Sequence, residues 1–252
     1  MCLALLALDA HPIYAVVVAA NRDEYHARPT APAAWWEEGW LAGRDLRAGG
    51  TWLGVTRRGR FAFLTNVRDP ASNDPAAPSR GSLVPAVLSS ASDPAASLAR
   101  MRAETAAHNG FNLLAGTQEG AAWMSNRTPD VKVLGRGTYG ISNALLDSPW
   151  PKVVRTKVAL ADWLARVDAD AEPLFTALAR RDVEADADLP STGVTLEWER
   201  RLSAPFIVSD AYGTRSSTVL TIDRDGEVRF VERSFDPHGL PAGQVEQRFR
   251  IA

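Results

Sequence analysis

The sequence predicts an α+β fold in which two antiparallel sheets lie inside and helices cover them. Three observations predict this fold. Most segments of strand length are joined by short turns, which favours antiparallel pairing. The helical patterns occur in two separate pairs instead of alternating with the strands. Several strand segments are apolar along their whole length, so both faces of the sheets they form must be covered.

Composition narrows the class of protein. A chain of 252 residues with 46% hydrophobic composition can build one large core, and no segment resembles an interdomain linker. We therefore expect a single domain over residues 1–252. The net charge of −2 gives no general attraction for nucleic acid. One cysteine and four scattered histidines offer no metal-ligand spacing, so we expect neither a metal nor a cofactor.

The apolar amino terminus does not predict a signal sequence. It lacks a basic region, and Asp9, His11 and Pro12 interrupt it at strand length. No other segment approaches the length of a membrane span. We expect a cytoplasmic protein without stable membrane insertion, and its oligomeric state stays unknown. Palmitoylation of Cys2 is an alternative that no polybasic or amphipathic neighbour supports.

The first strands form a hairpin. Residues 1–8 and 13–20 are apolar runs separated by a short turn at residues 9–12. A turn centred on Ala10 and His11 would set Cys2 opposite Ala19, within one residue. The polar tetrad at residues 21–24, Asn-Arg-Asp-Glu, would then emerge beyond the end of the first strand, close to Cys2.

The next segment begins irregularly and continues as a second hairpin. Pro29 and Pro32 predict an irregular stretch, and the tryptophans at 35, 36 and 40 predict core packing or a lid. Residues 49–56 and 61–67 pair across a turn at 57–60, and Asn66 closes the second strand. Glycines 49 and 50 mark a place where the backbone bends or passes close to another segment.

The middle of the chain contains the first helix pair and more strands. Residues 68–80 predict an exposed loop, followed by helices that start near Gly81 and Ser92. Strands are expected at 111–116, 121–126, 131–134 and 138–143. Glycines 135, 137 and 140 match a dinucleotide-binding spacing, but a strand follows them in place of a helix. We interpret them as turn residues.

The last third predicts a second helix pair and a final run of strands. Helices start at Pro151 and Pro173, and the acidic residues 182–188 predict a solvated loop or helix end. Residues 209–216 are expected to be irregular. Strands follow at 217–222, 227–235 and 244–251, the first two joined by the Asp225-Gly226 turn.

Several motifs together resemble one family. The chain resembles the NRDE family, also called the transport and Golgi organisation protein 2 family, nearly end to end. Its members are linked to lipid and acyl-CoA homeostasis and to haem trafficking. The layout is also similar to that of cysteine N-terminal nucleophile hydrolases such as bile-salt hydrolases and penicillin V acylase, which implies a four-layer αββα sandwich. The motifs that carry these resemblances are Met1-Cys2, Asn21-Arg22-Asp23-Glu24, Gly50-Thr51-Trp52-Leu53-Gly54, Leu64-Thr65-Asn66, Ser79-Arg80-Gly81, Gly110-Phe111-Asn112-Leu113-Leu114, Gly140-Ile141-Ser142-Asn143 and Tyr212-Gly213-Thr214-Arg215-Ser216-Ser217.

The resemblance also implies a set of site residues. These hydrolases carry cysteine, arginine, aspartate, asparagine, asparagine and arginine in this order along the chain. Here the order is filled by Cys2, Arg22, Asp23, Asn66, Asn143 and Arg215. Substrate contacts are expected from Asn21, Trp52 and Tyr212 in the same motifs. Arg22 and Asp23 are adjacent in this sequence, unlike in those enzymes, so which of them faces the nucleophile stays open.

Two functions follow as alternatives. If Met1 is removed, the amine of Cys2 can activate its own thiol, and Asn66 and Asn143 can stabilise the oxyanion during cleavage of an amide or thioester. Alternatively, the protein carries haem, a lipid or an acyl chain in a pocket lined by tryptophans, with Cys2 as a ligand or as core. Taken singly, a strand cysteine is most often core, a strand-end asparagine a turn former and an arginine part of a surface ion pair.

Overall fold

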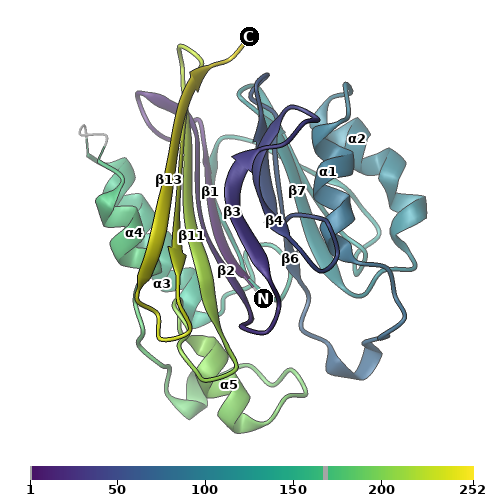
Figure 1. The fold of residues 1–252 in the computed structure, drawn as a ribbon, viewed down its shortest axis with the longest axis vertical. Helices are drawn as coiled ribbons and strands as arrows, with labels where there is room; N and C mark the ends of the chain where they lie inside the picture. The colour runs from purple at the N-terminus through teal and green to yellow at the C-terminus, as the bar shows by residue number, and fades with distance from the viewer. Residues whose placement is uncertain (1, 167–169) are drawn as a thin grey trace.

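Two antiparallel sheets pack face to face, and helices cover the outer side of each sheet (Figure 1). The computed structural model describes residues 2–166 and 170–252, with Cys2 described by its backbone alone. Expectations about Met1 and the Cys2 thiol lie outside the described residues. The four layers confirm the αββα sandwich expected from the sequence.

The first sheet has six strands in the order β10-β1-β2-β11-β12-β13. Its long central strands are β2 and β11, which pair over almost their whole length. The bounds are β1 Cys2–Leu8, β2 Tyr14–Tyr25, β10 Gly137–Ile141, β11 Tyr212–Asp223, β12 Glu227–Phe235 and β13 Pro241–Arg250.

The second sheet has seven strands in the order β3-β4-β5-β6-β7-β8-β9. Each strand pairs with the next along the chain. The connections are short except between β6 and β7, where residues 67–110 contain the first helix pair. The bounds are β3 Thr30–Trp35, β4 Trp40–Asp45, β5 Leu53–Thr56, β6 Phe61–Asn66, β7 Phe111–Thr117, β8 Gly120–Ser125 and β9 Lys132–Leu134.

The two predicted helix pairs lie on opposite outer faces (Figure 1). Helices α1 (Leu83–Leu88) and α2 (Pro94–Met101) cover the second sheet, whereas α3 (Pro151–Leu164) and α4 (Glu172–Leu178) cover the first. A fifth helix, α5 (Leu196–Ser203), lies at one end of the sandwich. Among the described residues, no helix combines the length and apolar character needed to cross a membrane.

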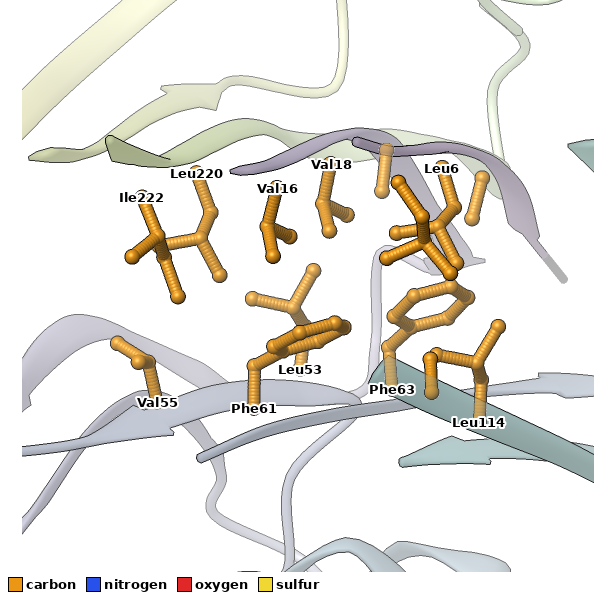
Figure 2. Packing of buried hydrophobic residues seen from close by; sticks show 14 of the residues in the cluster. Leu6, Val16, Val18, Leu53, Val55, Phe61, Phe63, Leu114, Leu220 and Ile222 are labelled. Atoms are coloured by element: carbon orange, nitrogen blue, oxygen red, sulfur yellow. The ribbon is translucent and has the colours of Figure 1, made fainter. Parts of the chain in front are cut away.

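The core between the sheets explains why the strands are apolar on both faces. Figure 2 shows Leu6, Val18 and Leu220 of the first sheet pointing at side chains of the second sheet such as Phe61 and Phe63. The alternate residues of β1 and β2 point the other way and pack under α3 and α4. The amino-terminal hairpin is therefore buried on both sides, as its sequence predicts.

The register predicted for this hairpin is wrong. Cys2 pairs with Arg22 and Leu8 with Val16, so the turn is wider than expected and the ladder is shifted by three residues. The reason is His11, which is 2% exposed. Its ring nitrogen Nδ1 accepts hydrogen bonds from the backbone amides of Ile13 (3.1 Å) and Tyr14 (3.3 Å), which holds a wide loop closed.

Three segments that were not predicted to be strands belong to strands. The tetrad at 21–24 continues β2, and residues 212–216 begin β11, because the two polar stretches pair with each other. Residues 30–35 form β3 despite Pro32. Proline is tolerated there because β3 is an edge strand and its register shifts between Ala31 and Ala34.

Candidate active site

A polar cavity of about 350 Å³ lies at the end of the sandwich where β1 begins. Its walls come from β2, from the β4–β5 connection, from the end of β6 and from the loop that precedes α1. Of the residues predicted to form the site, Arg22, Asp23, Asn66 and Trp52 line this cavity. The structure thus brings together residues from three separate parts of the chain.

Arg22 faces the space between the sheets. It is 5% exposed, and it pairs across the ladder with Cys2. Its Nη1 donates to Thr30 Oγ1 at 3.1 Å, and its guanidinium lies 4.3 Å from the ring centroid of Trp52. The hydrogen bond and the aromatic ring fix a cation beside the first residue of β1.

Asp23 is 1% exposed and is held by the neighbouring strand. Its Oδ1 accepts a hydrogen bond from Thr214 Oγ1 at 2.7 Å, and Thr214 in turn accepts one from the Ile207 amide at 2.9 Å. Burial raises the pKa of Asp23. The charges of Lys152 and Arg22, together with the Thr214 hydrogen bond, oppose that rise.

The two candidate oxyanion asparagines are linked to each other. Asn66 ends β6 and lines the cavity. Asn143 is 1% exposed, and its Nδ2 donates to the backbone oxygen of Asn66 at 2.9 Å. One amide hydrogen of Asn143 is therefore committed to holding the end of β6. Asn66 is the better placed donor for a ligand in the cavity.

Arg215 occupies a β-bulge. Thr214 pairs with Asp23 and Ser216 with Arg22, so Arg215 is the extra residue between them. Its Nη1 lies 3.2 Å from the carbonyl oxygens of Tyr25 and of Arg28, and burial followed by the charge of Arg22 lowers its pKa. Arg215 lines a neighbouring cavity of about 330 Å³ between β3 and β12, and Trp52 lines both cavities.

Asn21 and Tyr212, both predicted to contact substrate, are turned elsewhere. Asn21 Nδ2 donates to the carbonyls of Leu178 (2.8 Å) and Pro205 (2.9 Å) on the helical side of the sheet. Tyr212 is 4% exposed, with its ring 5.7 Å from that of Trp198. Both side chains hold the α5 region against the first sheet, and we assign them no contact with a ligand in the cavity.

Sequence reasoning missed several residues of this region. Arg28, Arg47 and Arg80 line the outer part of the cavity with Glu24 and Asp45, and Arg28 binds Asp45 through Nε at 2.9 Å. Arg80 lies in a recognised motif, which was the signal available for it. Thr214, also in a recognised motif, had no signal for its contact with Asp23, because that contact joins residues 191 positions apart.

The fold has a solved counterpart. The C2A mutant of the conjugated bile acid hydrolase from Clostridium perfringens superposes with a TM-score of 0.51 and 8% identity, over 100% of this chain and 92% of that chain. At this identity the likeness shows the fold alone. The four-layer αββα sandwich is therefore an N-terminal nucleophile (Ntn) hydrolase-like fold, shared with that bile acid hydrolase.

The sequence comparisons give the family. A profile of the family described as Transport and Golgi organisation 2 matches residues 1–237. The mouse homologue named Transport and Golgi organization 2 is 34% identical over 257 residues, covering 93% of both chains. The Drosophila melanogaster protein of that name is 28% identical, covering 95% of both chains. The chain belongs to the Transport and Golgi organisation 2 family.

Proposed function

We propose that this protein is a hydrolase with an N-terminal cysteine nucleophile that cleaves an amide or thioester bond in an acyl substrate. The observation that carries the proposal is the joint placement of Arg22, Asp23 and Asn66 around one polar cavity, beside the strand that begins at Cys2. Removal of Met1 would make the amine of Cys2 the chain's amino terminus. The structural counterpart, a hydrolase altered at its own second residue, supports this choice of nucleophile.

The chemistry requires no histidine. The free amine of an N-terminal residue has a pKa of about 7.7–8.0 and can accept the proton of its own thiol. The sulfur then attacks the substrate carbonyl carbon, and the carbon–nitrogen or carbon–sulfur bond breaks. The leaving group takes the proton from the ammonium. Water hydrolyses the resulting thioester, releases the carboxylic acid and restores the thiol.

The cavity residues have separate roles in this mechanism. The buried carboxylate of Asp23 would hold the ammonium form of the amine, and the cation of Arg22 would favour the thiolate. Asn66 would donate a hydrogen bond to the oxyanion of the tetrahedral intermediate. Removing one such donor typically lowers kcat by roughly 10²–10³, so Asn66→Ala is expected to fall in that range.

The first test is the intact mass of protein made in cells. Loss of the mass of one methionine on essentially all molecules is the expected result. Retention of Met1 on essentially all molecules would exclude the amine of Cys2 from the chemistry, because that nitrogen would be part of a peptide bond.

The second test compares wild type with Cys2→Ala and Asp23→Asn on a panel of acyl amides and acyl-CoA thioesters. Both variants are expected to lose turnover. Asp9→Asn is a matched control, because Asp9 is exposed and lies in the turn far along the strand from Cys2. Turnover by Cys2→Ala equal to wild type would remove Cys2 from the reaction.

One observation favours a second candidate, a carrier of an apolar ligand. A cavity of about 550 Å³ lies between α4 and strands β12 and β13, with Phe175, Phe235 and Pro241 in its walls. Arg233 borders it and binds Glu172 at 2.6 Å. Haem, lipid or acyl-CoA binding that survives Cys2→Ala and Asp23→Ala but is lost on Phe175→Ala would support the carrier.

A further inference from the structure

Lys152 is a cation in an unusual place. It is the second residue of α3 and is only 2% exposed, whereas lysine is almost never fully buried without a partner. The first turn of a helix also disfavours positive charge, because the helix dipole points its positive end there. A compensating interaction must therefore hold this ammonium.

One compensating group is the end of another helix. Lys152 Nζ donates to the carbonyl oxygen of Leu202, at 2.8 Å, in the last turn of α5. The carbonyls at a helix carboxyl end carry partial negative charge, which favours a cation. This bond fixes Lys152 to the beginning of the segment 202–207.

The segment 202–207 leads directly to Asp23. Its Pro205 carbonyl accepts a hydrogen bond from Asn21, and its Ile207 amide donates to Thr214 Oγ1. Thr214 Oγ1 donates to Asp23 at 2.7 Å. The ammonium of Lys152 and the carboxylate of Asp23 are thus anchored to the same short stretch of chain, on the helical side of β2.

The other charges nearby are accounted for separately. Arg68 binds Glu199 at 2.5 Å with both side chains 4% exposed, and Glu199 also accepts from Thr192. Arg22 is next to Asp23 on the same strand, and the charges of Lys152 on α3 and of Arg68 in the loop after β6 also act on Asp23. Glu184, which lines the same small void as Lys152, is bound by Arg155 at 2.7 Å. Since Glu199 is bound by Arg68 and Thr192 and Glu184 by Arg155, the carboxylate that Lys152 is placed to balance is Asp23.

We infer that Lys152 is a positioning residue that keeps Asp23 ionised from the side opposite to the cavity. This inference rests on the proposed function, in which ionised Asp23 holds the amine of Cys2. Lys152 lines a separate void of about 10 Å³ with Arg68 and Glu199, so it acts on the reacting groups through Asp23. Removing its charge disfavours the Asp23 carboxylate, because a buried carboxylate with fewer counter-charges takes up a proton more readily.

The single cysteine of the chain provides a direct readout. The rate of alkylation by iodoacetamide is measured from pH 5 to 10 on full-length wild type, Asp23→Asn, Lys152→Met and the double variant. A nearby carboxylate raises the pKa of a thiol and of an amine. The midpoint is the pH at which the alkylation rate is half its maximum. We therefore expect Asp23→Asn and Lys152→Met each to move this midpoint to lower pH, by about half to one unit. The double variant should move it no further than Asp23→Asn does.

Controls separate this role from a structural one. Lys157→Met lies on the same helix, where Lys157 forms a surface pair with Asp147, and its midpoint should equal that of wild type. Lys152→Gln removes the charge but keeps a donor for Leu202, and serves if Lys152→Met does not fold. Lys152→Arg keeps the charge and should restore the wild-type midpoint.

Two results would overturn the inference while leaving the proposed function intact. One is a shifted midpoint in Asp23→Asn with wild-type midpoints in Lys152→Met and Lys152→Gln. The other is a further shift when Lys152→Met is added to Asp23→Asn, since Lys152 would then act by another route. A wild-type midpoint in Asp23→Asn would overturn the proposed role of Asp23 and this inference with it.

Discussion

At the residue scale, the first sheet buries two carboxyl groups in different settings. The positive charges of Lys152, Arg22 and Arg68 act on Asp23. Glu232 is 2% exposed and faces the space between the sheets, where its Oε1 accepts a hydrogen bond from the Ala33 amide at 2.7 Å. Glu232 thereby ties the edge strand β3 to the opposite sheet. Burial raises the pKa of Glu232 to about 7.

This pKa predicts how stability depends on pH. The folded state binds the Glu232 proton more tightly than the unfolded state, whose carboxyl has a pKa of 4.5. The contribution of Glu232 to stability is therefore fully present below pH 4.5 and declines as the pH rises through about 7. Its full size is roughly 3 kcal/mol, from about 1.4 kcal/mol per pKa unit.

Glu232→Gln removes this titration and keeps an oxygen that can accept from Ala33. Between pH 5 and 8 the unfolding free energy of wild type should fall by up to roughly 3 kcal/mol relative to the variant. Urea unfolding at pH 5, 6, 7 and 8 measures the difference. Glu227→Gln, at an exposed position on the same strand, should follow wild type. Parallel curves for wild type and Glu232→Gln would contradict the prediction.

At the element scale, periodicity predicted most strands and both helix pairs, because their apolar faces are covered by the core. Periodicity did not predict the strand segments that are polar. Residues 21–25 and 212–216 pair with each other through buried polar side chains, so no apolar alternation marks them. The register of the amino-terminal hairpin could not be predicted from periodicity either, because it depends on the hydrogen bonds of one buried histidine, His11, and not on the strands.

Helix α5 carried signals that were overlooked. Thr195 caps it, with its Oγ1 accepting from the Trp198 amide at 3.4 Å. Acidic residues follow in the first turn and Arg200 and Arg201 in the last, as a helix dipole favours. The helix is short and has few apolar residues, so its hydrophobic pattern alone is weak. Its position at the end of the sandwich brings Leu202 to Lys152.

The glycines before β5 were expected where the backbone passes close to another segment, and this prediction is confirmed. A Cβ added to Gly50 would lie 2.3 Å from the carbonyl oxygen of Gly81, and the Thr51 amide donates to the same oxygen at 3.0 Å. This contact holds the loop before α1, which contributes Ser79 and Arg80 to the cavity wall.

Gly50→Ala should therefore force these two backbone segments apart. We expect a loss of about 1–3 kcal/mol in unfolding free energy, the usual cost of overpacking, measured by urea unfolding. Faster proteolysis within residues 68–82 should accompany it. Gly120→Ala is the matched control, because a Cβ there meets no atom within 4 Å. Equal stability of the two variants would show that the Gly50–Gly81 contact can relax without cost.

At the scale of the whole molecule, the candidate site depends on contacts that no local pattern contains. Arg22 and Asp23 come from β2, Asn66 from β6, and the Thr214 hydroxyl from β11. The order of these residues was found through the family resemblance. The bulge at Arg215 and the buried cation at Lys152 arise only when β2, β11, α3 and α5 are packed together.

The shared core between the sheets also predicts that they unfold as one unit. Phe63 of the second sheet is 3% exposed and belongs to the same cluster as Leu6 and Val18 of the first. Phe63→Ala leaves a cavity between the sheets, and should lower the unfolding free energy by about 3–5 kcal/mol. Because the lost contacts belong to both sheets, both sheets should lose protection from hydrogen exchange to the same extent.

Hydrogen exchange measured by mass spectrometry tests this expectation. In Phe63→Ala, peptides from β1 and β2 should lose as much protection as peptides from β6 and β7. Val133→Ala, at a position that is 70% exposed, should leave both sets as in wild type. Loss of protection confined to β6 and β7 would mean that the first sheet is stable without the second. The cavity would then lie between two independent units, and a change in one sheet would leave Asp23 and its partners in place.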